Sequence, residues 1–129
     1  MIPSPDMAAV AILAADVELR KVHQGRVSTD LQPGGPAIRV TLMPGGDPVT
    51  RWEWQATIQA DCYALDQIDA ANLAALVRSR WTDYTGRDLP DLDGYVSGCW
   101  VVADPMWVGD PDTKLARYSL MLGIAVHGR

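Results

Sequence analysis

Strict alternation between apolar and polar side chains over residues 51–62 constrains the fold of this chain more than any other feature. Every even-numbered residue there is apolar, and every odd-numbered one is polar or charged. Side chains of a β-strand point alternately to the two faces of a sheet, so the pattern predicts a strand with one buried and one polar face. At about 3.3 Å per residue the strand spans about 40 Å, well beyond an average strand. This length favours an extended platform over a pocket.

Two helices follow from the spacing of apolar residues and from their start signals. Ser4, Pro5 and Asp6 are typical of a helix start, and apolar residues three and four apart predict one continuous helix over residues 5–22. A second helix is predicted over residues 66–81, where alanine and leucine dominate. The residues that share its predicted apolar face are Ile68, Ala71, Ala75, Leu76 and, beside them, Leu73.

Alternating or β-branched stretches predict the remaining strands. They lie at residues 26–31, 37–42, 95–102 and 117–127. The connection at residues 82–94 is rich in Asp and is predicted to be a polar loop. Residues 104–113 are turn-prone by their Asp, Gly and Pro content, but they carry apolar residues that are expected to be exposed. The resulting order α-β-β-β-α-β-β predicts an α+β fold, with residues 1–129 forming one domain. We expect a single, mostly antiparallel sheet with two helices packed on one face.

Composition places the chain among ordinary globular proteins. It has 129 residues, 48% of them hydrophobic and 21% charged, which is enough to build one core. No apolar run approaches the ~20 residues of a membrane span, and the start of the sequence lacks the basic region of a signal peptide. A protein made in the cytoplasm, without membrane partners, is therefore expected.

The charge balance argues against a protein that grips nucleic acid. The chain carries a net charge of −5, and its basic residues do not form a stripe. Non-specific affinity for DNA or RNA requires Lys and Arg side chains that neutralise phosphates. An acidic protein can still surround DNA without holding it.

The sequence contains none of the common catalytic or cofactor-binding motifs. Its paired glycines at 34–35 and 45–46 are flanked by prolines and indicate turns rather than phosphate cradles. The aspartates at 82–94 lack the spacing of a calcium loop, and a solvated acidic loop explains them better. Those residues are Asp83, Asp88, Asp91 and Asp93. No catalytic residue, cofactor or metal site is predicted.

The two cysteines and two histidines are too far apart in the sequence to indicate a zinc site or a catalytic site. Cys62 and Cys99 are expected to be reduced, and Cys62 falls on the apolar face of its strand. His23 lies at a predicted helix end, where a partly positive imidazole suits the dipole, and His127 lies near the end of the sequence. Neither histidine has an evident partner in the sequence.

Tryptophan is unusually prominent, with five Trp residues and no Phe. Trp52 and Trp54 share the apolar face of the long strand, which leaves a core position or a partner interface open for both. Trp107 lies in a predicted loop of Pro, Asp and Gly. It is therefore expected to contribute to an interface.

Taken together, these blocks resemble the tail terminator (tail completion) proteins of long-tailed bacteriophages, particularly siphophages of actinobacterial hosts. The resemblance covers nearly the whole chain and rests on the order of the blocks rather than on one motif. Beyond the opening helix and the long strand that runs into an Ala/Leu helix, the blocks are residues 27–31, 33–36, 37–41, 45–47, 104–113 and 117–118.

The resemblance implies a structural protein without catalysis. Members of this family assemble as a hexameric ring on the head-proximal end of the tail tube, stop tube polymerisation and join the tail to the head connector. The implied partners are other copies of the chain, the tail tube protein and a head-completion (connector) protein. DNA passes through the ring without specific binding. The implied location is the head–tail junction of the virion, after assembly in the host cytoplasm.

Site residues follow from combining this resemblance with the strand pattern. A polar, non-basic face of the long strand suits a channel that must not retain DNA. The residues expected to face the lumen are Arg51, Glu53, Gln55, Thr57, Gln59 and Asp61. The residues expected at interfaces with the tube and connector are Met43, Asp47, Trp107, Asp110 and Asp112.

Two alternatives remain open at this point. One is a head-closure or neck protein of the same head–tail junction. The other is a small enzyme or ligand-binding domain that uses the acidic loop 82–94. The latter would require a concave site with perturbed titratable groups, and the sequence offers no nucleophile–base pair for it.

Overall fold

A computed structural model of the chain describes residues 2–30, 35–44, 52–90, 92–108 and 115–128. The helical elements are α1 (Pro5–Ala15), α2 (Val17–His23), α3 (Gln67–Trp81) and the 3-10 turn η1 (Thr82–Tyr84). The strands are β1 (Val27–Ser28), β2 (Ala37–Leu42), β3 (Glu53–Ala64), β4 (Arg87–Asp88), β5 (Gly94–Val108) and β6 (Ala116–Gly128).

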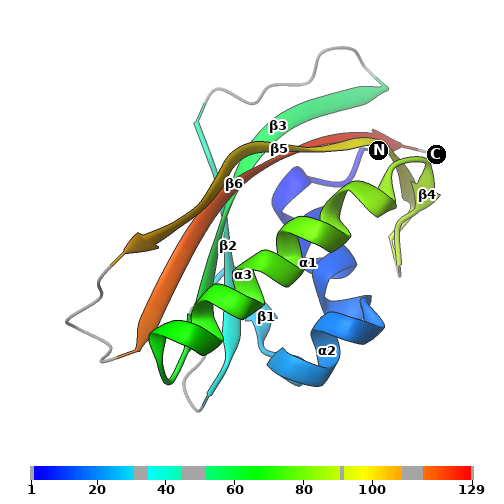
Figure 1. Cartoon of the computed structure of the whole chain (residues 1–129). Helices are drawn as coiled ribbons and strands as arrows, with labels where there is room; N and C mark the ends of the chain where they lie inside the picture. Colours follow the sequence, from blue (N-terminus) through cyan, green and yellow to red (C-terminus); the bar gives the residue numbers. More distant parts are fainter. Residues whose placement is uncertain (1, 31–34, 45–51, 91, 109–114, 129) are drawn as a thin grey trace.

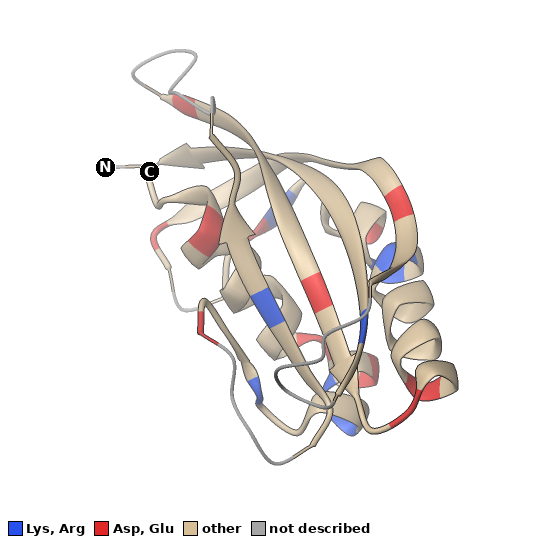
Figure 2. Cartoon of the chain, turned by 90° about the vertical axis from the view of Figure 1, so that its left-hand side faces the viewer, with Lys and Arg blue, Asp and Glu red and all other residues tan. Residues whose placement is uncertain are grey.

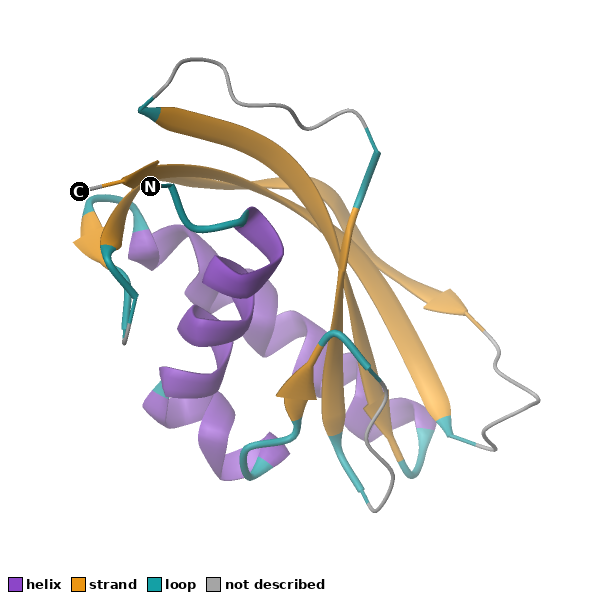
Figure 3. Ribbon diagram, turned by 180° about the vertical axis from the view of Figure 1, so that it is seen from behind, coloured by secondary structure: helices purple, strands orange, loops and turns teal. Residues whose placement is uncertain are grey.

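The described strands form one sheet in the order β1-β2-β3-β6-β5-β4. The pairing of β1 with β2 is parallel, and the other neighbours are antiparallel. Figures 1 and 3 show a curved sheet with all three α-helices gathered on one side of it. The predicted α+β class, with a mostly antiparallel sheet and helices on one face, is confirmed.

The predicted long strand is confirmed as β3, which extends to Ala64 instead of residue 62, and alternation between buried and accessible residues holds in it from Gln55 to Ala60. Ile58, Ala60 and Cys62 of β3 are fully buried in the core beneath the helices. Along its whole length β3 pairs with β6, from Glu53 opposite His127 to Ala64 opposite Ala116. These two strands therefore form the central support of the sheet.

The first helix is interrupted, which corrects the prediction of one continuous helix over residues 5–22. α1 ends at Ala15, and the buried Asp16 caps α2 by accepting a hydrogen bond from the backbone N–H of Leu19 at 3.0 Å. The same carboxylate accepts a hydrogen bond from Nε of Arg80 at 2.9 Å. Arg80, 64 residues away along the sequence, thus helps to stabilise the interruption between α1 and α2. The spacing of nearby residues does not reveal this contact.

The buried face of α3 differs from the predicted one. Ile68 is 72% exposed, and Ala75 is exposed as well. The indole N–H of Trp81 donates to the carbonyl oxygen of Gly123 at 3.0 Å, which fixes the end of the helix against β6. Because α3 is rich in alanine, more than one of its faces looks apolar in the sequence. The residues that it buries are Ala70, Leu73, Ala74, Val77 and Trp81.

Both predicted loops contain regular structure in their described parts. The segment 82–94 holds η1 and β4, and Leu89 within it is buried in the core. β5 continues through Val108 instead of ending at residue 102, with register shifts between Val101 and Met106. Such irregularities accommodate a proline within a paired strand. Pairing with β6 therefore overrides the turn-forming composition of residues 104–108.

Candidate interaction surface

The helices leave one face of the sheet uncovered, and this face carries the predicted lumen residues. Figure 2 looks onto it and shows few charged residues along the strands. Since the even-numbered residues of β3 enter the core, its odd-numbered residues point the other way. The described residues among the predicted set are Glu53, Gln55, Thr57, Gln59 and Asp61. Arg51 lies outside the described residues.

Asp61 lies on the uncovered face, yet its side chain is only 1% exposed. Its carboxylate accepts hydrogen bonds from Arg39 of β2 at 3.2 Å, from the Gln59 amide at 2.9 Å and from the hydroxyl of Ser119 of β6. The carboxylate thus links three neighbouring strands. Sequence alternation identified the face but not these cross-strand partners.

Tyr63 lies two residues beyond Asp61 on β3, next to the contacts of the Asp61 carboxylate. The side chain is fully buried, and the guanidinium carbons of Arg39 and Arg117 lie 5.7 and 6.0 Å from its ring centroid. Among the described residues, the Tyr63 hydroxyl and Nε of Arg39 are buried without a hydrogen-bond partner. We refer to Arg39, Asp61, Tyr63, Arg117 and Ser119 as the arginine–tyrosine cluster.

A second polar group lies at the opposite end of the same face. One oxygen of Glu53 is 3.1 Å from Nε2 of His127 and accepts a hydrogen bond from the Ser97 hydroxyl at 3.1 Å. The His127 ring stacks on Tyr95 with centroids 4.8 Å apart. The carboxylate, not the imidazole, contacts the serine, which is unlike the arrangement that activates a nucleophile. His127 therefore has partners that the sequence did not reveal.

The centre of the uncovered face is small and neutral. Gln55 is exposed beside Thr57, and the indole of Trp100 covers Gly123. A Cβ atom at Gly123 would come within 2.1 Å of that ring, so the close approach requires glycine. Trp100 is 40% exposed and forms an aromatic surface between the two polar groups.

Exposed apolar side chains occur near both ends of the central strands. Trp52, whose carbonyl accepts a hydrogen bond from the N–H of Gly128, is 65% exposed. Trp107, near the other end of β6, is 44% exposed and packs against Tyr118 with ring centroids 5.5 Å apart. Trp52 is thus not a core residue, while Trp54 is half-buried.

Of the predicted interface residues, Met43 and Trp107 belong to the part of the chain that the structure describes. Met43, directly after β2, is half-buried, and its N–H donates to the Thr57 carbonyl at 3.0 Å. Asp47, Asp110 and Asp112 lie outside the described residues. Trp107 belongs to β5 rather than to a loop.

Titratable groups with shifted pKa values occur on the helical side. Burial raises the pKa of Asp16, but hydrogen bonds from the Tyr84 hydroxyl, the Leu19 N–H and Arg80 outweigh this and hold it below its ordinary range. Burial and the bond to Asp16 raise the pKa of Tyr84. These groups border a hollow of about 320 Å³, where the Asp16 carboxylate is engaged by three donors. The arrangement fixes the α1–α2 break to the end of α3.

His23 corrects another sequence-based expectation. It is fully buried and accepts a hydrogen bond at Nδ1 from the N–H of Gly25, while Nε2 lies 3.0 Å from the carbonyl of Leu13. Burial lowers its pKa below the ordinary value of 6.5. The ring is therefore held in the neutral form and does not act as a positive charge at the helix end.

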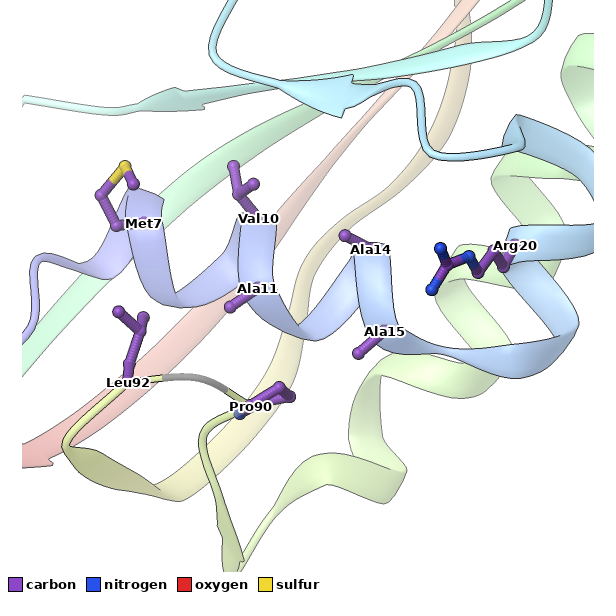
Figure 4. A pocket seen from close by; sticks show the side chains of 8 residues that line it. All are labelled: Met7, Val10, Ala11, Ala14, Ala15, Arg20, Pro90 and Leu92. Atoms are coloured by element: carbon purple, nitrogen blue, oxygen red, sulfur yellow. The ribbon is translucent and has the colours of Figure 1, made fainter.

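A further hollow of about 250 Å³ lies between α1 and the segment before β5 (Figure 4). Its lining is mainly apolar, with Arg20 as its charged residue.

Burial raises the pKa of the Cys99 thiol to about 12 and also raises the pKa of the Cys62 thiol, which makes both thiols unreactive. Within the described ranges, no three His, Cys, Asp or Glu residues come close enough together to hold a metal ion. None of the described helices has the length and apolar character needed to cross a bilayer.

Comparisons with known proteins reveal a similarity of fold but no similarity to a known family. No protein-family model and no curated protein matches the sequence. Among solved structures, the fold is similar to that of a chain from the "Virion of native gene transfer agent (GTA) particle", with a TM-score of 0.61 and 20% sequence identity. The similarity covers 95% of this chain and 96% of that chain. At this level of identity, the comparison shows a shared fold.

Proposed function

We propose that this chain is a structural virion protein of a tailed phage or phage-like particle, and that it acts there as a tail terminator. Copies of the chain would form a ring, expected to be hexameric, on the head-proximal end of the tail tube. The ring would stop tube polymerisation and join the tail to the head connector. This role requires positioning and docking, and it needs no catalysis.

The fold similarity to a virion chain is the observation that carries this proposal. It extends over nearly the full length of both chains, so it does not arise from one common supersecondary unit. A shared fold alone does not determine function. The surface properties of this chain therefore supply the second argument.

The chemistry of the uncovered face suits a passage for DNA. Each of the two acidic residues of β3 on this face has a partner: Glu53 contacts His127, and Asp61 contacts Arg39. Gln55, which lies between the two acids along the strand, is neutral. The stretch of β3 between Glu53 and Asp61 contains no Lys or Arg that could hold phosphates, so DNA would slide along it rather than bind. We propose that the lining consists of Arg51, Glu53, Gln55, Thr57 and Gln59. Asp61, which is buried in the single chain, would support this lining from within.

The exposed tryptophans suit docking at two ends. Trp52 lies beside Gly128 at one end of β6, whereas Trp107 lies beside Tyr118 near the other. Interfaces are enriched in Trp and Met, and Met106 is exposed next to Trp107. We propose that one end contacts the tail tube protein and the other the connector. Met43, Asp47, Asp110 and Asp112 are further candidates at these contacts.

Deleting the gene from a particle-producing genome tests the terminator role. A terminator is expected to leave tail-less heads together with abnormally long tail tubes, because nothing stops polymerisation. A head-closure protein, the nearest alternative, would leave tails of normal length that fail to attach. Normal, infectious or transfer-competent particles would contradict both roles and favour a small enzyme or binding domain.

Self-association provides a second test with the purified chain. Mass photometry over a concentration series is expected to show a species near six times the 14.0 kDa mass of one chain. Trp107→Ala is expected to weaken this assembly while the fold persists, because Trp107 is partly exposed at the end of β5. Ile68→Ala, which changes an exposed residue of α3, serves as the control. A Trp107→Ala variant that melts early but assembles like the original chain would remove Trp107 from the interface.

A further inference from the structure

The arginine–tyrosine cluster is the one place where buried polar atoms of the described chain lack partners. The Tyr63 hydroxyl and Nε of Arg39 are both buried there without a hydrogen bond. Most buried polar groups in folded proteins have at least one partner, because leaving one unsatisfied costs about 1–3 kcal/mol. Two such atoms in one cluster therefore indicate a missing ligand.

The residues around these atoms are suited to a negatively charged group. The guanidinium groups of Arg39 and Arg117 lie over the same Tyr63 ring, within 5.7 and 6.0 Å of its centroid. Arginine presents several N–H donors in a plane and matches the oxygens of a carboxylate or phosphate. The Tyr63 hydroxyl adds a further donor. Three donor side chains thus come together from β2, β3 and β6.

The one described acid within the cluster leaves the Tyr63 hydroxyl without an acceptor. Asp61 accepts from the terminal nitrogen of Arg39 at 3.2 Å, while its other oxygen bonds to Gln59 and Ser119. Tyr63 and Asp61 are both on β3, two residues apart, and point to the same face of the sheet. The Asp61 carboxylate therefore neutralises one side of the cluster and leaves the Tyr63 hydroxyl to another acceptor.

The neighbouring surface is hollowed beside two members of the cluster, Arg117 and Ser119, whereas Tyr63 and Arg39 do not line the hollow. A groove of about 220 Å³ runs between β6 and the end of β5, with Gln59, Arg117 and Ser119 among its lining residues. The side chain of Arg39 is itself 33% exposed. Because Tyr63 is fully buried, only a small group can reach its hydroxyl.

We propose that the arginine–tyrosine cluster is a binding site for a small oxyanion, held by Arg39, Arg117 and the Tyr63 hydroxyl. The bound anion would satisfy the buried donors and fasten β2, β3 and β6 together at this end of the sheet. The site does not depend on the virion role. It is a property of the folded chain.

Thermal unfolding of the purified chain tests the site, with inorganic phosphate and acetate as probes and sodium chloride at equal ionic strength as the reference. A ligand that binds only the folded state raises the Tm with saturable concentration dependence. A rise of about 2–5 °C over the chloride reference is expected for a chain of this size. A response to acetate as well as phosphate would show that carboxylates are accepted. A response to phosphate alone would restrict the site to phosphate-like anions.

Two variants locate the response. Tyr63→Phe removes only the hydroxyl and is expected to fold, but the anion-dependent rise in Tm should fall to less than half. Arg117→Gln should reduce it further, whereas Arg20→Gln, at an exposed position on α2, should leave it unchanged. The proposal is overturned if phosphate and acetate act no differently from chloride. It is equally overturned if Tyr63→Phe responds as strongly as the original chain.

Discussion

The two faces of the sheet are stabilised in different ways. The covered face packs aliphatic and small residues against α1 and α3, and Trp81 of α3 is the largest fully buried side chain in this layer. The uncovered face instead uses cross-strand polar contacts, such as Arg39 with Asp61 and His127 with Glu53. One face therefore relies on apolar packing, while the other relies on contacts between polar side chains of neighbouring strands. This division suits a subunit that must be rigid and yet present a smooth surface.

The largest effect is expected on the covered face. Trp81→Ala removes a fully buried indole together with its hydrogen bond to Gly123. We expect a loss of about 3–5 kcal/mol in the free energy of unfolding, measured by urea denaturation. Ile68→Ala, an exposed change on the same helix, should stay within about 0.5 kcal/mol. Similar values for both variants would refute the assignment of the buried face of α3.

A smaller effect is expected on the uncovered face. Asp61→Asn keeps the shape of the side chain but loses the charge-assisted bond to Arg39. We expect a loss of about 1–3 kcal/mol in the free energy of unfolding, because the contact between the buried position 61 and Arg39 becomes weaker. Gln55→Ala, at an exposed position of the same strand, is the matched control. If both changes prove neutral, the polar cluster does not stabilise this face.

The buried His23 and Asp16 of the helical layer predict that the free energy of unfolding depends on pH. Burial lowers the pKa of His23, with Arg20 and Arg26 adding to this effect, while the Leu13 carbonyl and Asp16 oppose it. As the pH falls below 6.5, the unfolded chain takes up a proton that the folded chain resists, so the free energy of unfolding decreases. The lowered pKa of Asp16 adds a further loss, at pH values below its ordinary 3.8.

Urea denaturation between pH 8 and pH 5 measures the His23 contribution. His23→Gln is expected to be less stable at neutral pH, since the buried ring and its two contacts are lost. Its stability should nevertheless change less between pH 7 and pH 5 than that of the original chain. An unchanged slope would show that another group causes the acid sensitivity.

The smallest effect on stability is expected from changes that test the surface itself. Gln55→Lys combined with Thr57→Lys adds two positive charges to the uncovered face and should alter the free energy of unfolding by about 0.5 kcal/mol or less. If this face lines a DNA passage, the same change should slow DNA ejection from particles or make DNA adhere to the ring. Unchanged ejection together with unchanged DNA affinity would exclude the face from the lumen.

The sequence predicted the parts of this molecule that depend on local periodicity. Alternation over residues 51–62 identified β3 and its buried face, and the α+β class followed from the order of elements. Features that depend on distant partners were missed. The break at Asp16 relies on Arg80, and the extension of β5 to Val108 relies on pairing with β6.

The candidate surface was predicted less completely than the fold. Alternation assigned Gln55 and Thr57 to the polar face, but it gave Asp61 the same status although its side chain is buried. Burial of a polar residue depends on what neighbouring strands contribute, and here Arg39 and Ser119 come from two other strands. The exposure of Trp52 could likewise not be predicted from the sequence, because the alternating pattern placed this residue on the apolar face of the strand.

Cryo-electron microscopy of intact particles that contain this chain is the most direct test of the proposed terminator role. We expect a hexameric ring of the chain between the tail tube and the head connector, with β3 and β6 turned toward the DNA channel. Density for the chain elsewhere in the particle, or a ring whose uncovered sheet face is packed against another protein away from the channel, would contradict it.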